Sequence, residues 1–300
     1  MKHNIINLLS IFFISMFFAC SSPKEEVAPI DDQPPQEVIE EEVKDDDGVF
    51  YQVPTPNELF SVIKNSKIDY NNEILNDVSN IDKYNSKSAK ALNFGVFAAD
   101  LAYISSLGHI EDISPVFETL RNLSKELEIE NALDEAIYQR IQSNMDNSNA
   151  DSLFYLSNET YYNAYSYLEQ SDRGGVLGMI VIGGWIEGLN ILLNLAPFEE
   201  GSELSERIAD QRLTLENLLI FTSRIDNPDL DMVVSELEPI DEVFMTLEEV
   251  ESKEELTTSK GDDGVVVFGG GSTVSISNEQ YNQLKSVVNE LRNSIVDVAL

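Results

Sequence analysis

Residues 176–196 read VLGMIVIGGWIEGLNILLNLA, an apolar run that contains four glycines. A second run, residues 87–107, reads KSAKALNFGVFAADLAYISSL and repeats alanine and glycine along its length. Glycine inside a helix costs about 1 kcal/mol relative to alanine, so several glycines in one helix indicate that another backbone approaches it closely. We therefore predict that these two helices cross at short distance in the centre of the core.

The run at 176–196 also has the length of a membrane span. Glu187 lies near its middle, however, and Asn190 and Asn194 follow closely. A carboxylate at the centre of a bilayer costs several kcal/mol, which disfavours a span. We interpret the run as a helix buried in the protein core.

Capping residues indicate where other helices begin. Thr55-Pro56-Asn57-Glu58 combines an N-cap threonine, a proline at the first helical position and the glutamate of a capping box. Ser86 can cap the helix at 87–107, which Gly108 ends. The other expected helices span 114–128, 131–146, 151–170, 203–224, 229–256 and 278–298, with the short connections typical of antiparallel neighbours.

One segment departs from the helical pattern. Residues 265–268 and 273–276 are rich in β-branched residues, and Gly269-Gly270-Gly271-Ser272 separates them. This pattern predicts a hairpin at about 264–277, which either packs on the helices or offers an edge to a partner. The expected fold is mainly α, a multi-helix bundle or array with one small β-hairpin before the C-terminal helix.

The first twenty residues carry an export signal. Lys2 precedes an apolar run from Ile5 to Phe18, and Ala19-Cys20 follows, with Cys20 the only cysteine of the chain. This stretch resembles a bacterial lipoprotein signal. The resemblance implies that residues 1–19 are a signal peptide and that Cys20 becomes an N-terminus carrying palmitate-type acyl chains, which anchor the protein to a membrane. The alternative is an ordinary signal peptide with an incidental cysteine.

Residues 20–48 have the composition of a tether. Between Pro23 and Gly48 there are eleven acidic residues and no aromatic residue. Such a segment cannot bury enough apolar surface to offset its chain entropy, so we expect a disordered tether that precedes a folded domain at 49–300. Ser21 after the cysteine resembles outer-membrane sorting. Lys24-Glu25-Glu26 resembles the surface-export signal of Bacteroidota lipoproteins, although a plain acidic spacer explains it equally well.

The whole chain is strongly acidic, with a formal net charge of −35. This charge repels phosphate backbones, so nucleic acid is excluded as an expected partner. The resemblance of the leader, through Cys20 and Ser21, implies a lipid-anchored protein of the outer membrane, on its periplasmic side or at the cell surface. The expected partners are the membrane, through the anchor, and another envelope protein.

Two acidic residues inside the apolar helices deserve a chemical hypothesis. Asp100 and Glu187 should be partly buried, with raised pKa values or with arginine or lysine partners. They can act as general acid and base, hold a metal, or form an ordinary salt bridge. His109, the one histidine after the leader, is expected to cap a helix end. We predict no catalytic residue, metal or cofactor from any familiar motif.

Aromatic residues supply the candidate binding surface. Phe154, Tyr161, Tyr165 and Leu168 share one face of the helix at 151–170 and suit a core. Tyr155 and Tyr162 fall beside that face, where they can line a groove for a sugar, a peptide or a protein. The candidate binding residues are Tyr155, Tyr162, Asp100, Glu187 and Trp185.

Three blocks of residues are similar to uncharacterised helical lipoproteins of Bacteroidota: Ala91-Leu92-Asn93-Phe94-Gly95, Ala99-Asp100-Leu101-Ala102-Tyr103 and Gly183-Gly184-Trp185-Ile186-Glu187. The resemblance implies an envelope address and a helical fold but no activity. We therefore expect a non-catalytic binding or scaffold module with an unknown ligand. The alternative is an enzyme or metal-dependent protein that uses Asp100 and Glu187, which requires the two acids about 5–9 Å apart in a cleft open to solvent.

The leader gives a direct prediction. Cys20→Ala should abolish labelling of the protein by a fatty-acid probe in the producing cells, because the chain has no second thiol to carry the lipid. Labelling that persists in the variant would contradict the anchoring interpretation.

Overall fold

The computed structural model describes residues 43–44, 50–51, 55–64, 68–132, 135–195, 197–251, 257–260, 266–269, 272–298 and 300. All of them belong to one compact unit, residues 34–300. The expected signal peptide, Cys20 and most of the expected tether lie outside the described residues. The two-residue strands β1 (Val43–Lys44) and β2 (Phe50–Tyr51) pair antiparallel across the expected domain boundary at residue 49.

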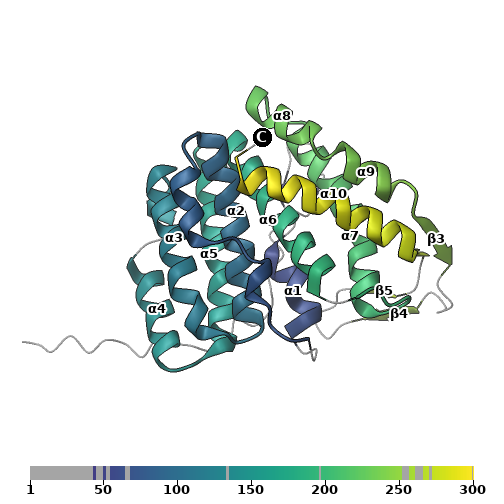
Figure 1. Ribbon diagram of the computed structural model, residues 1–300, viewed down its shortest axis with the longest axis horizontal. Coiled ribbons are helices and arrows are strands. Elements are labelled where there is room, and N and C mark those ends of the chain that lie inside the picture. The colour runs from purple at the N-terminus through teal and green to yellow at the C-terminus, as the bar shows by residue number, and fades with distance from the viewer. Residues whose placement is uncertain are drawn as a thin grey trace, which may run out of the picture. The chain divides into compact units, whose positions relative to one another are not determined.

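Helices dominate the described chain, so the prediction of a mainly α fold is confirmed (Figure 1). The α-helices are α1 (Pro56–Lys64), α2 (Lys87–Ser106), α3 (Ile113–Glu126), α4 (Glu135–Asp146), α5 (Ala150–Gln170), α6 (Gly174–Leu195), α7 (Glu203–Thr222), α8 (Pro228–Ser235), α9 (Glu238–Phe244) and α10 (Asn278–Val296). Short 3₁₀ helices are η1 (Asn72–Ile74), η2 (Val78–Lys83), η3 (Ile110–Asp112) and η4 (Glu130–Ala132).

Helices α2 and α6 form the centre of the fold. They pack against each other, with α3–α5 on one side and α7–α10 on the other (Figure 1). Every residue from 91 to 106 in α2 and from 175 to 193 in α6 is buried. Among the described residues, α6 alone is long and apolar enough to cross a membrane, and its most apolar window is entirely buried in the protein. The prediction of a buried helix is therefore confirmed.

Glycines explain how closely these two helices approach. A Cβ atom added to Gly95 would overlap the carbonyl oxygen of Ile180 and lie 2.5 Å from the backbone nitrogen of Gly184. A Cβ atom on Gly183 would overlap the carbonyl oxygen of Leu92. Backbone atoms cannot move aside as a side chain can, so both positions require glycine at this crossing. The predicted close crossing of the two helices is confirmed.

The predicted caps around α2 and α10 are also present. Ser86 Oγ accepts a hydrogen bond from the Ala89 N–H at 3.0 Å, and Gly108 ends the helix with φ +74°. Ser277 and Gln280 form the reciprocal bonds of a capping box at the start of α10. These local signals therefore determine where the helices begin and end.

The single helix expected at 229–256 is wrong. The chain forms the two short helices α8 and α9 and then a strand, β3 (Glu248–Glu251). Pro239 lies in the first turn of α9, where its missing N–H is tolerated, but it cannot continue a helix from α8 because its ring restricts the preceding residue. Glu236 and Leu237 therefore separate the two helices.

The expected strands before the C-terminal helix are present, but their expected pairing is wrong. Strand β5 (Val266–Gly269) pairs antiparallel with β4 (Thr257–Lys260), and β6 (Ser272–Ser275) pairs antiparallel with β3. Turn residues occur at two places, in the predicted turn Gly269-Gly270-Gly271-Ser272 and in Gly261-Asp262-Asp263-Gly264. Turn residues alone therefore do not decide which strands pair. The pairing is decided by partner strands outside the predicted hairpin: β3 lies in the segment expected to be helical, and β4 lies just after it.

Alanine substitution tests the helix crossing. Gly95→Ala and Gly183→Ala should each lower the free energy of unfolding by about 3 kcal/mol, because backbone overlap outweighs the gain of about 1 kcal/mol in helix propensity. Gly174→Ala is the control, since its Cβ would lie 3.2 Å from a side-chain methyl group of Ile225, which can shift. Urea titration followed by circular dichroism measures all three, and equal effects would contradict the crossing.

Candidate functional site

The α2–α6 crossing places Asp100 and Glu187 together in the core. Both side chains are 0% exposed. Arg292 of α10 reaches them and donates from Nε to Glu187 Oε2 at 2.7 Å and from Nη2 to Oε1 at 3.0 Å. The expected arginine partner is therefore present for Glu187. Asp100 is held differently, because its Oδ2 accepts the backbone N–H of Asn76 at 3.2 Å.

The two buried acids, Asp100 and Glu187, form an electrostatic cluster with the guanidinium group of Arg292. We call the two acids the acid pair. Burial raises the pKa of Asp100 well above its usual value, and the charge of Glu187 raises it further, against the opposing effects of Arg292 and the Asn76 N–H. Burial alone would lower the pKa of Arg292, but the charge and hydrogen bonds of Glu187 outweigh it and raise that pKa. The expected raised pKa is thus found at Asp100.

Residues 68–84 cover the acid pair, and we call them the covering segment. Arg292 Nη2 donates to the Ile74 carbonyl at 3.3 Å, and the Asn71 N–H donates to the Tyr103 hydroxyl at 3.0 Å. The side chain of Asn76 is buried and donates to the Tyr84 hydroxyl at 2.9 Å. The covering segment is therefore held over α2 and α10 by these hydrogen bonds, in addition to apolar side chains such as Ile74 and Tyr84 that pack on the core.

Two-carboxylate chemistry requires two acids that lie together in a cleft open to solvent, and this geometry meets only the first condition. Asp100 and Glu187 face one another, but neither carboxyl group has any surface in contact with solvent. A general acid or base has to reach its substrate, and a neutralised, enclosed pair cannot do so while the covering segment is closed. Within the described ranges, no group of three or more His, Cys, Asp or Glu side chains is placed to hold a metal ion.

The aromatic residues of α5 divide as predicted. Phe154, Tyr161, Tyr165 and Leu168 are buried, whereas Tyr155 and Tyr162 are half-buried. Lys64 Nζ lies 5.1 Å from the ring centroid of Tyr155, and the ring of Tyr162 contacts that of Tyr161 edge-on with centroids 6.3 Å apart. Tyr155 and Tyr162 therefore keep part of their surface open to a ligand, and their binding role stays a prediction.

The contacts of Trp185 and His109 are those of residues with a structural role. Trp185 is 2% exposed, and its indole N–H donates to Gln211 Oε1 at 3.0 Å, so it contributes to the core. His109 caps the end of α2 through its backbone, as expected, because its N–H donates to the Ile104 carbonyl at 3.2 Å, but its side chain makes no cap hydrogen bond at the start of η3. Its ring stacks on Tyr70 instead, with centroids 3.8 Å apart and planes 16° apart.

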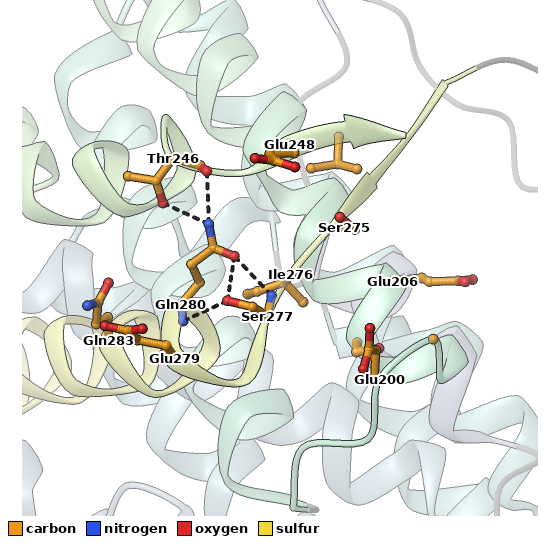
Figure 2. Close-up of a pocket in the computed structure, with 13 residues that line it drawn as sticks. Glu200, Glu206, Thr246, Glu248, Ser275, Ile276, Ser277, Glu279, Gln280 and Gln283 are labelled. Atoms are coloured by element: carbon orange, nitrogen blue, oxygen red, sulfur yellow. Dashed lines mark hydrogen bonds between the residues drawn. The ribbon is translucent and has the colours of Figure 1, made fainter. Parts of the chain in front are cut away.

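A surface cleft of about 930 Å³ lies between the starts of α7 and α10 and the paired strands β3 and β6 (Figure 2). We call it the acidic cleft because four glutamates line it and no lysine, arginine or histidine does. Figure 2 shows Glu248 beside Ser275, with Glu200 and Glu206 below them and Glu279 on the side of α10. The glutamates are Glu200, Glu206, Glu248 and Glu279.

The N-terminus of α10 fixes one wall of the acidic cleft. Gln280 Nε2 donates to the Thr246 carbonyl at 2.8 Å and lies 3.1 Å from the Thr246 hydroxyl (Figure 2). The Ser277 N–H donates to Gln280 Oε1 at 2.9 Å. The capping box of α10 thereby ties this helix to the loop before β3, so the cleft has a defined shape.

Comparison with protein-family models, with curated proteins and with solved structures finds no match for this chain. Function therefore has to be argued from the residues of the site. The sequence interpretation missed Arg292, Asn76 and the cleft glutamates. Arg292 alone carried a signal, since it lies among Val288, Leu291 and Ile295 on the apolar side of α10.

Loss of Arg292 tests the acid pair. Arg292→Met should lower the free energy of unfolding at pH 8 by about 3–5 kcal/mol, because Glu187 then keeps a buried charge without its two donors. Arg212→Met is the matched control, since Arg212 on α7 lies 3.3 Å from the half-exposed Glu216, and such pairs contribute about 0–1 kcal/mol. Urea titration measures both variants, and an equal loss would contradict a buried cluster.

Proposed function

We propose that the protein is a lipid-anchored lipoprotein of the outer membrane that acts as a non-catalytic binding or scaffold module. The leader motif ending at Cys20 supports the anchor, and the acidic cleft supports the binding role. Asp100 and Glu187 support a non-catalytic module, because they are enclosed and Arg292 binds Glu187 at both oxygens. An envelope protein is the proposed partner.

The acidic cleft is the observation on which the proposal depends. It is large enough for several side chains, and its charged lining residues are all glutamates. Grouped charges of one sign attract ligands of the opposite sign and speed their association. The ligand that fits is therefore a segment of a partner protein that carries lysine or arginine.

The strands beside the cleft suggest how such a segment binds. Val274 and Ser275 of β6 line the cleft, and β6 pairs with β3 in a sheet of two strands. A two-stranded sheet leaves outer backbone groups that can pair with an added strand. An extended basic segment can thus combine backbone pairing with contacts to the glutamates.

The enzyme hypothesis has one observation in its favour, which is that Asp100 and Glu187 lie together. It requires the covering segment to open and admit a substrate. The enclosed arrangement favours the binding module.

A peptide-binding measurement tests the proposal. The probe is a six-residue peptide of alternating lysine and valine, and fluorescence anisotropy gives its Kd. Combined substitution of Glu200, Glu206 and Glu248 by glutamine should raise the Kd about tenfold, because the attraction of three charges is lost. A peptide with glutamate in place of lysine should bind neither protein.

Glu73, Glu130 and Glu242 are exposed outside the cleft, so their substitution by glutamine makes a control of equal charge. The control variant should keep the Kd of the unmodified protein. If both variants weaken binding equally, the attraction comes from the total charge and the cleft is not the binding site.

A further inference from the structure

Asp100 Oδ1 is a buried oxygen without a hydrogen-bond donor. Among the described residues no group donates to it, whereas Oδ2 of the same carboxyl group accepts the Asn76 N–H at 3.2 Å. An ionised carboxylate only accepts hydrogen bonds, and leaving a charged oxygen unsatisfied in the core is costly. A protonated carboxyl group removes the difficulty, because its O–H can donate to a neighbouring acceptor.

Glu187 is the neighbouring acceptor. Arg292 donates two hydrogen bonds to Glu187, which favour its ionised form, and Asp100 receives one from a backbone amide. Arg292 balances one negative charge, so a second ionised acid would leave the cluster with an unbalanced buried charge. The proton of the pair therefore belongs on Asp100.

We propose that Asp100 is protonated in the folded protein and donates its hydrogen to Glu187, and that this shared proton keeps the covering segment closed over the acid pair. Loss of the proton places a second negative charge beneath residues 68–84. Water has to reach that charge, and the covering segment, whose Asn76 N–H donates to Asp100, is the element that can open to admit it.

Other groups face Asp100 from the surrounding elements. Glu187 faces it from α6, Arg292 from α10, and Tyr70 and Tyr84 from the covering segment. Burial raises the pKa of Tyr84 to about 12 and that of Tyr70 above its usual value, so both stay neutral at moderate pH. The tyrosines therefore do not change their charge at moderate pH.

The sign of the pH dependence follows from the raised pKa of Asp100. In the unfolded chain an aspartate titrates at about pH 4. Stability from the shared proton is fully present below that pH and is lost as the pH rises through the higher pKa of the folded state. We therefore expect the covering segment to open as the pH rises and to stay closed in acid.

Hydrogen exchange followed by mass spectrometry on the full chain tests the proposal between pH 5 and pH 9. In the unmodified protein, the protection of residues 68–84, corrected for intrinsic exchange, should fall by up to about tenfold per pH unit as the pH rises toward the pKa of Asp100 in the closed state, and should level off above it. Asp100→Asn should remove this dependence, because its amide oxygen can accept from Asn76 and its NH₂ group can donate to Glu187. Asp77→Asn, an exposed change in the same segment, should keep it.

Infrared spectroscopy gives an independent readout that needs no stable Asp100 variant. At pH 7 the unmodified protein should show the C=O band of a protonated carboxyl group, and Asp210→Asn should retain that band although burial raises the pKa of Asp210 as well. Absence of the band at pH 7 would overturn the proposal. A pH dependence that is unchanged in Asp100→Asn would also overturn it.

Discussion

The backbone contact between α2 and α6 is the constraint on which the rest of the structure depends. Gly95 lies against the carbonyl of Ile180 and Gly183 against that of Leu92, at positions where a Cβ atom would overlap. Asp100 follows Gly95 by five residues and Glu187 follows Gly183 by four, so the crossing that brings the backbones together also brings the two acids together. The acid pair is thus a consequence of how the central helices pack.

The buried charges then determine where two other elements lie. Arg292 has to reach Glu187, which fixes the position of α10, and Asn76 has to reach Asp100, which fixes the covering segment. A buried ion pair contributes little net stability when compared with apolar packing, because its groups lose their hydration. In this fold the ion pair instead constrains the position of α10, since a shifted α10 would leave Glu187 charged and unpaired in the core.

The sequence predicted those features that depend on local signals. The glycine pattern identified the central crossing, Ser86 and Ser277 identified helix starts, and the acids inside apolar helices were expected to be buried with a cationic partner. The choice of Arg292 as that partner, the contact from Asn76, and the pairing of β3 with β6 all join residues far apart in the chain. No local pattern encodes them, because they follow from how complete elements pack. The acidic cleft was missed for the same reason, since four scattered glutamates meet only after folding.

The enclosed cluster organises the fold, and the open acidic cleft is the proposed binding site for a partner. The central claim is that the α2–α6 contact creates the acid pair, and the pH dependence of stability in Gly95→Ala tests it most directly. If the contact creates the pair, widening it should admit water to Asp100, so the free energy of unfolding of Gly95→Ala should lose the fall between pH 5 and pH 9 that is expected of the unmodified protein. A Gly95→Ala protein that is less stable but keeps the full pH dependence would contradict the account.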